Sequence, residues 1–263
     1  MTPLHFSQQI DWSQPWLQPL RNLGEGLAQA ALARQNLPAA LNACGLAAVQ
    51  FVPQAELPEG VAYEAHIHQT ARVPTREGLH DFFNALCWMR YPHTKRVLNR
   101  LQAQAIQQAR GVQATRGPLR DALTLFDENA VLLHLPEPLW QALLARDWHT
   151  LFVAQRALWG TARCELFGHA LVEQLVRPFK AITGHVLCLP MPAEGPWDAW
   201  LAQHLTPEWL ASKPFAPMPV LGVPGWCPAN QQPGYYDDSA VFRPPNPQKN
   251  PVVFLEKHFA ATI

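Results

Sequence analysis

Charge is scarce in this sequence: only 15% of its 263 residues are Asp, Glu, Lys or Arg, and the formal net charge is zero. A chain without an excess of positive charge has no strong long-range attraction to nucleic acid or to an anionic membrane surface. We therefore expect no nucleic-acid partner and no membrane partner. Hydrophobic residues make up 48%, enough for a large core, and we predict one domain over residues 1–263.

Long apolar segments and cysteine pairs are also missing. No run approaches the roughly 18 apolar residues that a transmembrane helix needs, and the first 16 residues lack the basic and apolar regions of a secretory signal. The five cysteines are odd in number, widely spaced and never arranged as CxxC. This distribution predicts free thiols, gives no support to a thiolate zinc site, and suits a cytoplasmic protein.

Several catalytic signatures are absent as well. The chain has no P-loop, no GxGxxG, no GxSxG and no HExxH. The nucleotide-binding folds, nucleophile-elbow hydrolases and zinc proteases that carry these motifs are therefore not indicated. Any chemistry has to come from polar clusters without a standard motif.

Hydrophobic periodicity predicts an α+β fold, mainly helical, with a small antiparallel sheet or hairpin and a long, irregular, proline-rich C-terminal segment. The expected helices are 15–35, 38–44, 75–90, 93–110, 136–159 and 162–183. The expected strands are 47–53 and 61–70, with a hairpin over 123–135 whose turn is Asp-Glu-Asn. Residues 184–190 fit either a helix or a strand.

Many of the 26 prolines follow residue 190, which argues against long regular elements there. The same stretch is rich in aromatic residues, which disordered tails lack. We therefore predict that residues 191–263 form an ordered segment that wraps over the body. Within it, residues 215–245 should pack through Trp226, Tyr235, Tyr236 and Phe242.

Polar side chains crowd into the apolar segment TREGLHDFFNALCWMRYPHTK, residues 75–95. At 100° per residue, His80, Asn84, Cys87 and Tyr91 lie within about 60° of one another on a helix, beside Asp81. A buried polar group without a partner costs roughly 1–3 kcal/mol. This stripe must therefore face other polar groups, water, a metal or a ligand.

A second polar stripe lies in CELFGHALVEQLVRPFK, where His169 and Glu173 are four residues apart. Such a pair can bind a metal or tune a histidine. Two apolar helices that each carry a polar stripe lose least free energy when the stripes meet. We predict that the two stripes face each other, with Arg120 and Asp121 nearby.

Three other groups are weaker candidates. Asp127 and Glu128 fall in the expected hairpin turn, where such residues are ordinary. His66 and His68 would share one face of a strand, as in some metal sites, although most such pairs face solvent. Cys87 lies near His80 and Tyr91, but a free cysteine is usually a small buried residue rather than a nucleophile.

Five blocks of the chain together resemble a known family. They are YEAHI, VPTREGLHDFFNALCWMRYPHTK, RDALTLFDENAVLL, FGHALVE and LGVPGW…YYDDSAVFRP, in this order over residues 50–245. The pattern resembles the proteobacterial domain of unknown function 3025. The chain departs from it by reading DENA where the family has DENG. The resemblance implies that these blocks belong together and implies no activity.

Two functions fit these patterns. The first is a metal-assisted or acid–base hydrolase of a small, anionic molecule, with a divalent metal as a candidate cofactor. Its catalytic residues would be His80, Asp81, Asn84, Arg120, Asp121, His169 and Glu173, and its ligand-binding residues Arg76, Tyr91 and Lys95. The alternative is a non-catalytic binding or assembly protein. Its polar helix faces would form a buried network, and its tryptophan-rich surface would bind a protein partner.

Overall fold

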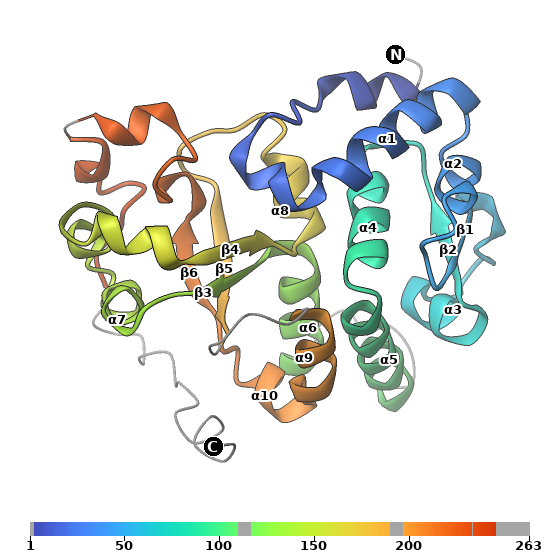
Figure 1. The fold of residues 1–263 in the computed structure, drawn as a ribbon. Helices are drawn as coiled ribbons and strands as arrows, with labels where there is room; N and C mark the ends of the chain where they lie inside the picture. The colour runs from blue at the N-terminus through green and yellow to red at the C-terminus, as the bar shows by residue number, and fades with distance from the viewer. Residues whose placement is uncertain (1–2, 110–116, 190–196, 233, 246–263) are drawn as a thin grey trace.

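A computed structural model describes residues 3–109, 117–189, 197–232 and 234–245. The helices are α1 (Gln18–Arg34), α2 (Leu37–Ala43), α3 (Tyr63–Thr70), α4 (Leu79–Arg90), α5 (Pro92–Gln108), α6 (Pro118–Asn129), α7 (Glu137–Ala145), α8 (His169–Gln174), α9 (Trp197–His204) and α10 (Pro207–Ala211). The strands are β1 (Gln50–Pro53), β2 (Arg72–Thr75), β3 (Ala130–His134), β4 (Arg163–Leu166), β5 (Thr183–Cys188) and β6 (Ala216–Pro219). The predicted class, α+β and mainly helical, is confirmed (Figure 1).

The larger sheet has the strand order β4-β3-β5-β6. Strand β3 runs parallel to β5 and antiparallel to β4, and β6 is antiparallel to β5. Every residue of β3 is buried, as expected of a strand covered on both faces. A separate parallel pair, β1 and β2, lies near α2 and α3 (Figure 1).

The larger sheet separates two hydrophobic cores. Because side chains alternate along a strand, Val131 and Leu133 of β3 belong to one core, and Ala130 and Leu132 to the other. The first core also contains α1, α2, α4, α7 and α8, and the second is built mainly from α5, α6, α9 and α10. The assignment of residues 1–263 to one domain stays a prediction.

Helix α4 is buried along its length, from Asp81 to Met89. It contacts α1, α5 and α8. Pro92 separates it from α5 and occupies the first turn of that helix, where a missing backbone N–H costs nothing. The carboxylate of Asp198 accepts hydrogen bonds from the backbone N–H groups of His93 and Thr94, at 3.0 and 2.7 Å, and so caps α5 from α9.

Two strand predictions were wrong. Residues 61–70 contain helix α3, and its buried residues His66 and Ile67 are sequence neighbours, which a strand would direct to opposite faces. The hairpin over 123–135 does not form. Helix α6 begins with Pro118 in its first turn and continues through the supposed turn to Asn129, followed directly by β3.

Two helix predictions were too long. Residues 162–183 contain strand β4 and the short helix α8, divided at Gly168. Residues 136–159 contain α7, then a π-helical turn (Thr150–Ala154) and a 3₁₀ turn (Arg156–Thr161). Residues 184–190 belong to strand β5 as far as Cys188. The other predicted helices and the strand within 47–53 are confirmed with small shifts in their ends.

The described C-terminal residues contain only short elements, as their proline content predicts. Phe242 is buried in the first core, and Trp226, Tyr235 and Tyr236 pack against that core. The indole N–H of Trp148 donates to the Arg243 carbonyl at 2.7 Å, which ties the segment to the body. The predicted packing of residues 215–245 is thus confirmed, whereas 191–196, 233 and 246–263 lie outside the described residues.

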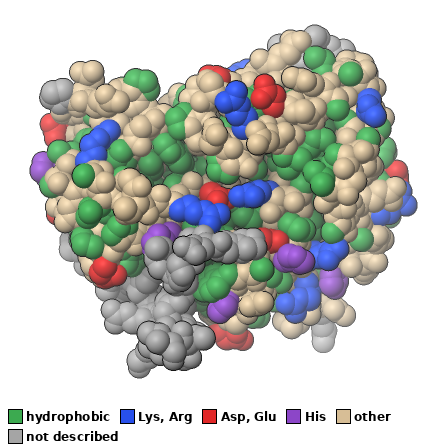
Figure 2. Space-filling model, viewed as in Figure 1, with side chains coloured by type: hydrophobic (Ala, Val, Ile, Leu, Met, Phe, Trp, Pro, Cys, Tyr) green, Lys and Arg blue, Asp and Glu red, His purple; other side chains and the backbone are tan. Residues whose placement is uncertain are grey.

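The surface matches the low charge content. Figure 2 shows a face of mostly hydrophobic and uncharged side chains, with charged groups in small, separate clusters. All five cysteines are free. Among the described residues, no helix combines the length and the apolarity needed to cross a membrane.

Candidate functional site

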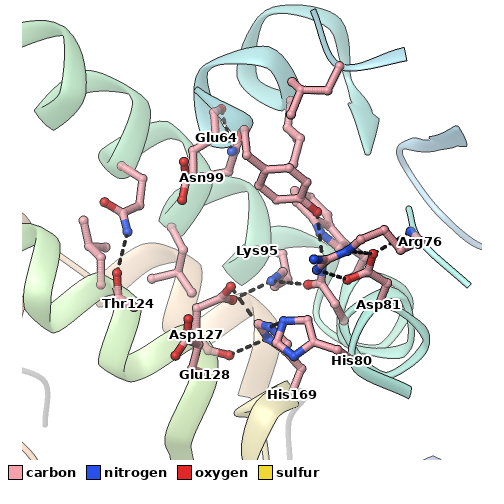
Figure 3. Close-up of a pocket in the computed structure, with 18 of the residues that line it drawn as sticks. Glu64, Arg76, His80, Asp81, Lys95, Asn99, Thr124, Asp127, Glu128 and His169 are labelled. Carbon is pink, nitrogen blue, oxygen red and sulfur yellow. Dashed lines mark hydrogen bonds and ion pairs between the residues drawn. The ribbon is translucent and has the colours of Figure 1, made fainter. Parts of the chain in front are cut away.

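A cavity of about 340 Å³ lies between helices α3, α4, α5, α6 and α8. Most of the residues that line it are polar, and they include both predicted stripes, represented by His80 and Asn84 of α4 and by His169 of α8 (Figure 3). Small-molecule sites in proteins have volumes of about 300–1,000 Å³. The cavity is therefore large enough for a small ligand.

The two histidines face each other at one end of this cavity. His80 Nε2 and His169 Nε2 are 3.1 Å apart, with the rings close to perpendicular. His80 Nδ1 lies 2.9 Å from Glu173 Oε2, and His169 Nδ1 lies 2.8 Å from the backbone carbonyl oxygen of Asp127. The prediction that the stripes of α4 and α8 meet is confirmed.

The partners of these rings fix the positions of their protons. A carboxylate and a carbonyl oxygen can only accept hydrogen bonds. His80 Nδ1 and His169 Nδ1 must therefore both be donors. If both rings were neutral, two Nε2 lone pairs would face each other at 3.1 Å. A hydrogen bond between them requires one additional proton, which would give the pair three protons and one positive charge.

The two rings differ in exposure. The His169 side chain is 6% exposed and that of His80 is 39% exposed. Burial, reinforced by the positive charges of Lys95 and His80, lowers the pKa of His169 to about 4 despite the opposing effect of Asp127. Because His169 is kept neutral, a hydrogen bond between the rings would run from His80 Nε2–H to the Nε2 of His169.

A buried lysine organises the centre of the cavity (Figure 3). Lys95 is 4% exposed, and its ammonium donates to Asn84 Oδ1 at 2.8 Å and to Asp127 Oδ1 at 2.5 Å. Asn84 in turn donates to the Tyr63 hydroxyl at 3.2 Å. Burial opposes the charge of Asp127, but the positive charge of Lys95 and its hydrogen bond lower the pKa of Asp127 below the ordinary value. Asp127 is thus a carboxylate bound to an ammonium.

Arg76 and Asp81 form a second ion pair at the cavity wall. Arg76 donates from Nε at 3.0 Å and from Nη2 at 2.9 Å to the two carboxylate oxygens of Asp81. The Arg76 backbone N–H also donates to Asp81, at 2.6 Å. The Arg76 side chain is 64% exposed. The pair fixes the loop before α4 and leaves part of the guanidinium in contact with solvent.

One backbone carbonyl positions both His169 and Asp127. The Ala130 oxygen accepts the N–H of Phe167 at 3.0 Å and the N–H of Gly168 at 2.9 Å. Gly168 allows this approach because a Cβ there would lie 2.4 Å from the Asn129 backbone nitrogen. The start of α8 is therefore held against the end of α6, with Asp127 three residues before Ala130 and His169 directly after Gly168.

Four predicted residues lie elsewhere. Tyr91 is buried and donates to Glu165 at 2.5 Å. Cys87 donates to the Phe167 carbonyl, and burial raises the pKa of its thiol to about 12. Asp121 lies at the surface 3.7 Å from Lys213.

Arg120 is buried, and its Nε has no hydrogen-bond partner among the described residues. It does not line the cavity. The expectation that Arg120 and Asp121 lie near the histidines was wrong, because both are near the start of α6 whereas Asp127 is two turns further on.

Asp127, and not Arg120 or Asp121, is the residue of α6 that lies beside the histidines. From the sequence it was expected in a hairpin turn and was a weaker candidate. Two signals predict helix rather than hairpin here. Pro118 is typical of a first helical turn, and Leu119, Leu123 and Phe126 recur at helical spacing. If the segment is read as a helix, Asp127 falls in its last turn, directly before the buried strand β3.

A metal ion in the cavity would need several ligating side chains close together. The described part of the chain contains no group of three or more His, Cys, Asp or Glu side chains that would hold a metal ion. His66 and His68 do not act together, since His66 is buried in α3 and His68 is exposed.

Comparison with known proteins identifies the family. The chain matches the family described as protein of unknown function (DUF3025) over residues 49–246, which is most of its length, and it belongs to that family. This agrees with the resemblance noted from the sequence. No curated protein and no solved structure matches the chain.

Proposed function

We propose that this cavity is the active site of an acid–base hydrolase of small molecules. The observation that carries the proposal is the pair of imidazoles whose Nε2 atoms lie 3.1 Å apart at the wall of an open cavity. Imidazoles are common general acids and bases near neutral pH. Glu173 orients His80, the Asp127 carbonyl orients His169, and the Lys95–Asp127 pair fixes α5 against α6.

In the proposed reaction, substrate and water separate the two Nε2 atoms. Neutral His169 takes a proton from the water as its oxygen attacks the scissile bond. His80, positively charged, gives its Nε2 proton to the leaving group. The proton then on His169 passes to His80 across the 3.1 Å contact, which restores the starting state. One pair thus supplies both the base and the acid, and the protons balance without a metal.

Two further observations support parts of this reading. Cys87 is buried and protonated, so the attacking group is water rather than a thiolate. The five free thiols suit a reducing compartment such as the cytoplasm.

The alternative function is a binding protein with the same cavity. Such a protein would bind a small molecule and release it unchanged.

The test is substrate discovery with matched variants. Wild type, His80→Asn, His169→Asn and the exposed control His149→Asn would each be incubated with a small-molecule cell extract and followed by mass spectrometry. Asn is chosen because its amide nitrogen replaces the donor at Nδ1 and does not titrate. We expect compounds that wild type and the control consume and the two site variants do not. Consumption by all four proteins, or by none, would contradict the proposal.

Two measurements check the mechanism separately. Nitrogen NMR of the histidine rings at pH 7 should show three protonated nitrogens among the four of the pair. A chelator should leave turnover unchanged. If chelation abolished turnover and a divalent metal restored it, the metal-assisted hydrolase would replace the acid–base mechanism proposed here.

A further inference from the structure

The cavity continues away from the histidines, between α3, α5 and α6. Glu64 of α3, Asn99 and Gln102 of α5 and Thr124 of α6 line this part. Figure 3 shows Glu64, Asn99 and Thr124 on the side of Lys95 and Asp127 that is remote from His80. Lys95, Asn99 and Gln102 follow one another at spacings of four and three residues, so one face of α5 spans the whole cavity.

The side-chain amide N–H groups of Asn99 and Gln102 in this part of the cavity already donate hydrogen bonds within the protein. Asn99 Nδ2 donates to the Glu64 backbone carbonyl at 2.9 Å. Because a carbonyl can only accept, the Asn99 nitrogen must face it, which leaves Asn99 Oδ1 for another partner. Gln102 Nε2 lies 3.1 Å from Thr124 Oγ1 and donates to it. Both amides thus offer oxygen rather than nitrogen.

Gln102 gives an independent indication of a missing donor. The residue is 8% exposed, and its Oε1 is buried without a hydrogen-bond partner among the described residues. Buried acceptors in native proteins are nearly always satisfied, and each exception costs roughly 1–3 kcal/mol. A ligand that brings N–H groups into this end of the cavity, with a small shift of the amide, would remove that cost.

Charge points to the same kind of ligand. Four carboxylates line the cavity, those of Glu64, Asp81, Asp127 and Glu128, against two permanent cations, Arg76 and Lys95. Both cations are matched by Asp81 and Asp127. Glu64 makes none of the ion pairs among the described residues, so its carboxylate adds negative charge to the cavity that neither of these cations matches.

We propose that the substrate is a small cation, a protonated amine or a guanidinium compound, whose charged group binds Glu64 together with the Asn99 and Gln102 oxygens. Its reacting bond then lies at His80 and His169. This inference rests on the proposed hydrolase and specifies its substrate class. It replaces the expectation of an anionic substrate, because Arg76 and Lys95 are paired and Arg120 lies outside the cavity. Tyr63 and Trp88, which also line the cavity, supply aromatic surface that suits a cation.

Binding of probes of one chain length and different charge tests the substrate class. Agmatine, putrescine, 1,4-butanediol and succinate would be titrated into the full chain by calorimetry. We expect agmatine or putrescine to bind at least tenfold more tightly than the diol, and succinate not to bind. Glu64→Gln should weaken the cation at least tenfold. Glu208→Gln, which removes an exposed carboxylate on α10, should not change it.

The outcomes separate this inference from the proposed function. Retention of cation binding within threefold in His80→Asn, with its loss in Glu64→Gln, supports a cation subsite distinct from the histidines. Succinate binding as tightly as agmatine, no binding of either cation, or unchanged affinity in Glu64→Gln overturns the inference. The hydrolase proposal would survive any of these results if wild type still consumed compounds that the histidine variants did not.

Discussion

Replacement of His169 by Asn should change how the stability of this protein depends on pH. The unfolded chain binds a proton at this histidine below about pH 6.5, its ordinary pKa, whereas the folded protein does so only near pH 4. Between these values the unfolded state holds more protons, so the free energy of unfolding falls as the pH falls. For a single site with these two pKa values, the loss between pH 7 and pH 5 is about 2 kcal/mol.

His169→Asn removes this titration and keeps a donor for the Asp127 carbonyl. Urea unfolding followed by tryptophan fluorescence at several pH values would give the free energy of unfolding for each protein. We expect the wild type to lose about 2 kcal/mol more than the variant between pH 7 and pH 5. At pH 7 the comparison reports only the cost of the substitution itself.

Another histidine, partly buried, affects wild type and variant equally. Burial also lowers the pKa of His185, so it contributes a fall in stability of the same sign to both proteins and cancels in the comparison. Carboxylates whose folded pKa is lowered, Asp127 among them, lose their stabilising effect mainly below about pH 5 and do so in both proteins. Equal slopes for wild type and His169→Asn would show that His169 is not neutral in the folded state, and the proton assignment of the pair would be wrong.

Three further substitutions test the structure around the site. Lys95→Met should cost about 3 kcal/mol in urea unfolding, because it leaves Asp127 without its cation, and adding Asp127→Asn should recover part of that loss. Gly168→Ala should lower the free energy of unfolding by about 3 kcal/mol, with a fall in melting temperature, since the added Cβ meets the backbone of α6, whereas Gly160→Ala has open space and should be near neutral. Phe242→Ala should cost about 3 kcal/mol and speed proteolysis of the C-terminal segment, and a variant as stable as wild type would contradict its place in the core.

The sequence was informative about α4 and α8 because their patterns are strong. The apolar and polar sides of residues 79–90 separate cleanly at helical spacing, and a buried polar stripe has few alternatives to meeting another. The free-energy cost of burying polar groups without partners is then enough to predict the contact between His80 and His169. Nothing local indicates the 3.1 Å distance between them, since it depends on where the backbone of α8 begins.

The sequence reading failed where two periodicities compete. Tyr63, Ala65 and Ile67 alternate as in a strand, yet Tyr63 and Ile67 also have the spacing of four that helix α3 uses. Asp127 and Glu128 resemble a turn between two apolar runs, yet the first run is the end of α6. In both places tertiary packing decided between local patterns of similar strength, and the second place hid a central residue of the cavity.

The double hydrogen bond at the Ala130 carbonyl has a consequence for how this fold can change over evolution. Main-chain hydrogen bonds of Phe167 and Gly168 hold the start of α8, and with it position 169, close to position 127. Substitutions of the side chains at positions 127 and 169 therefore leave the distance between the two backbone positions unchanged, and the fold stays the same. A relative that keeps glycine at 168 but carries other side chains at 127 and 169 would present a new pair of reactive groups in the same cavity, so one scaffold can serve more than one chemistry.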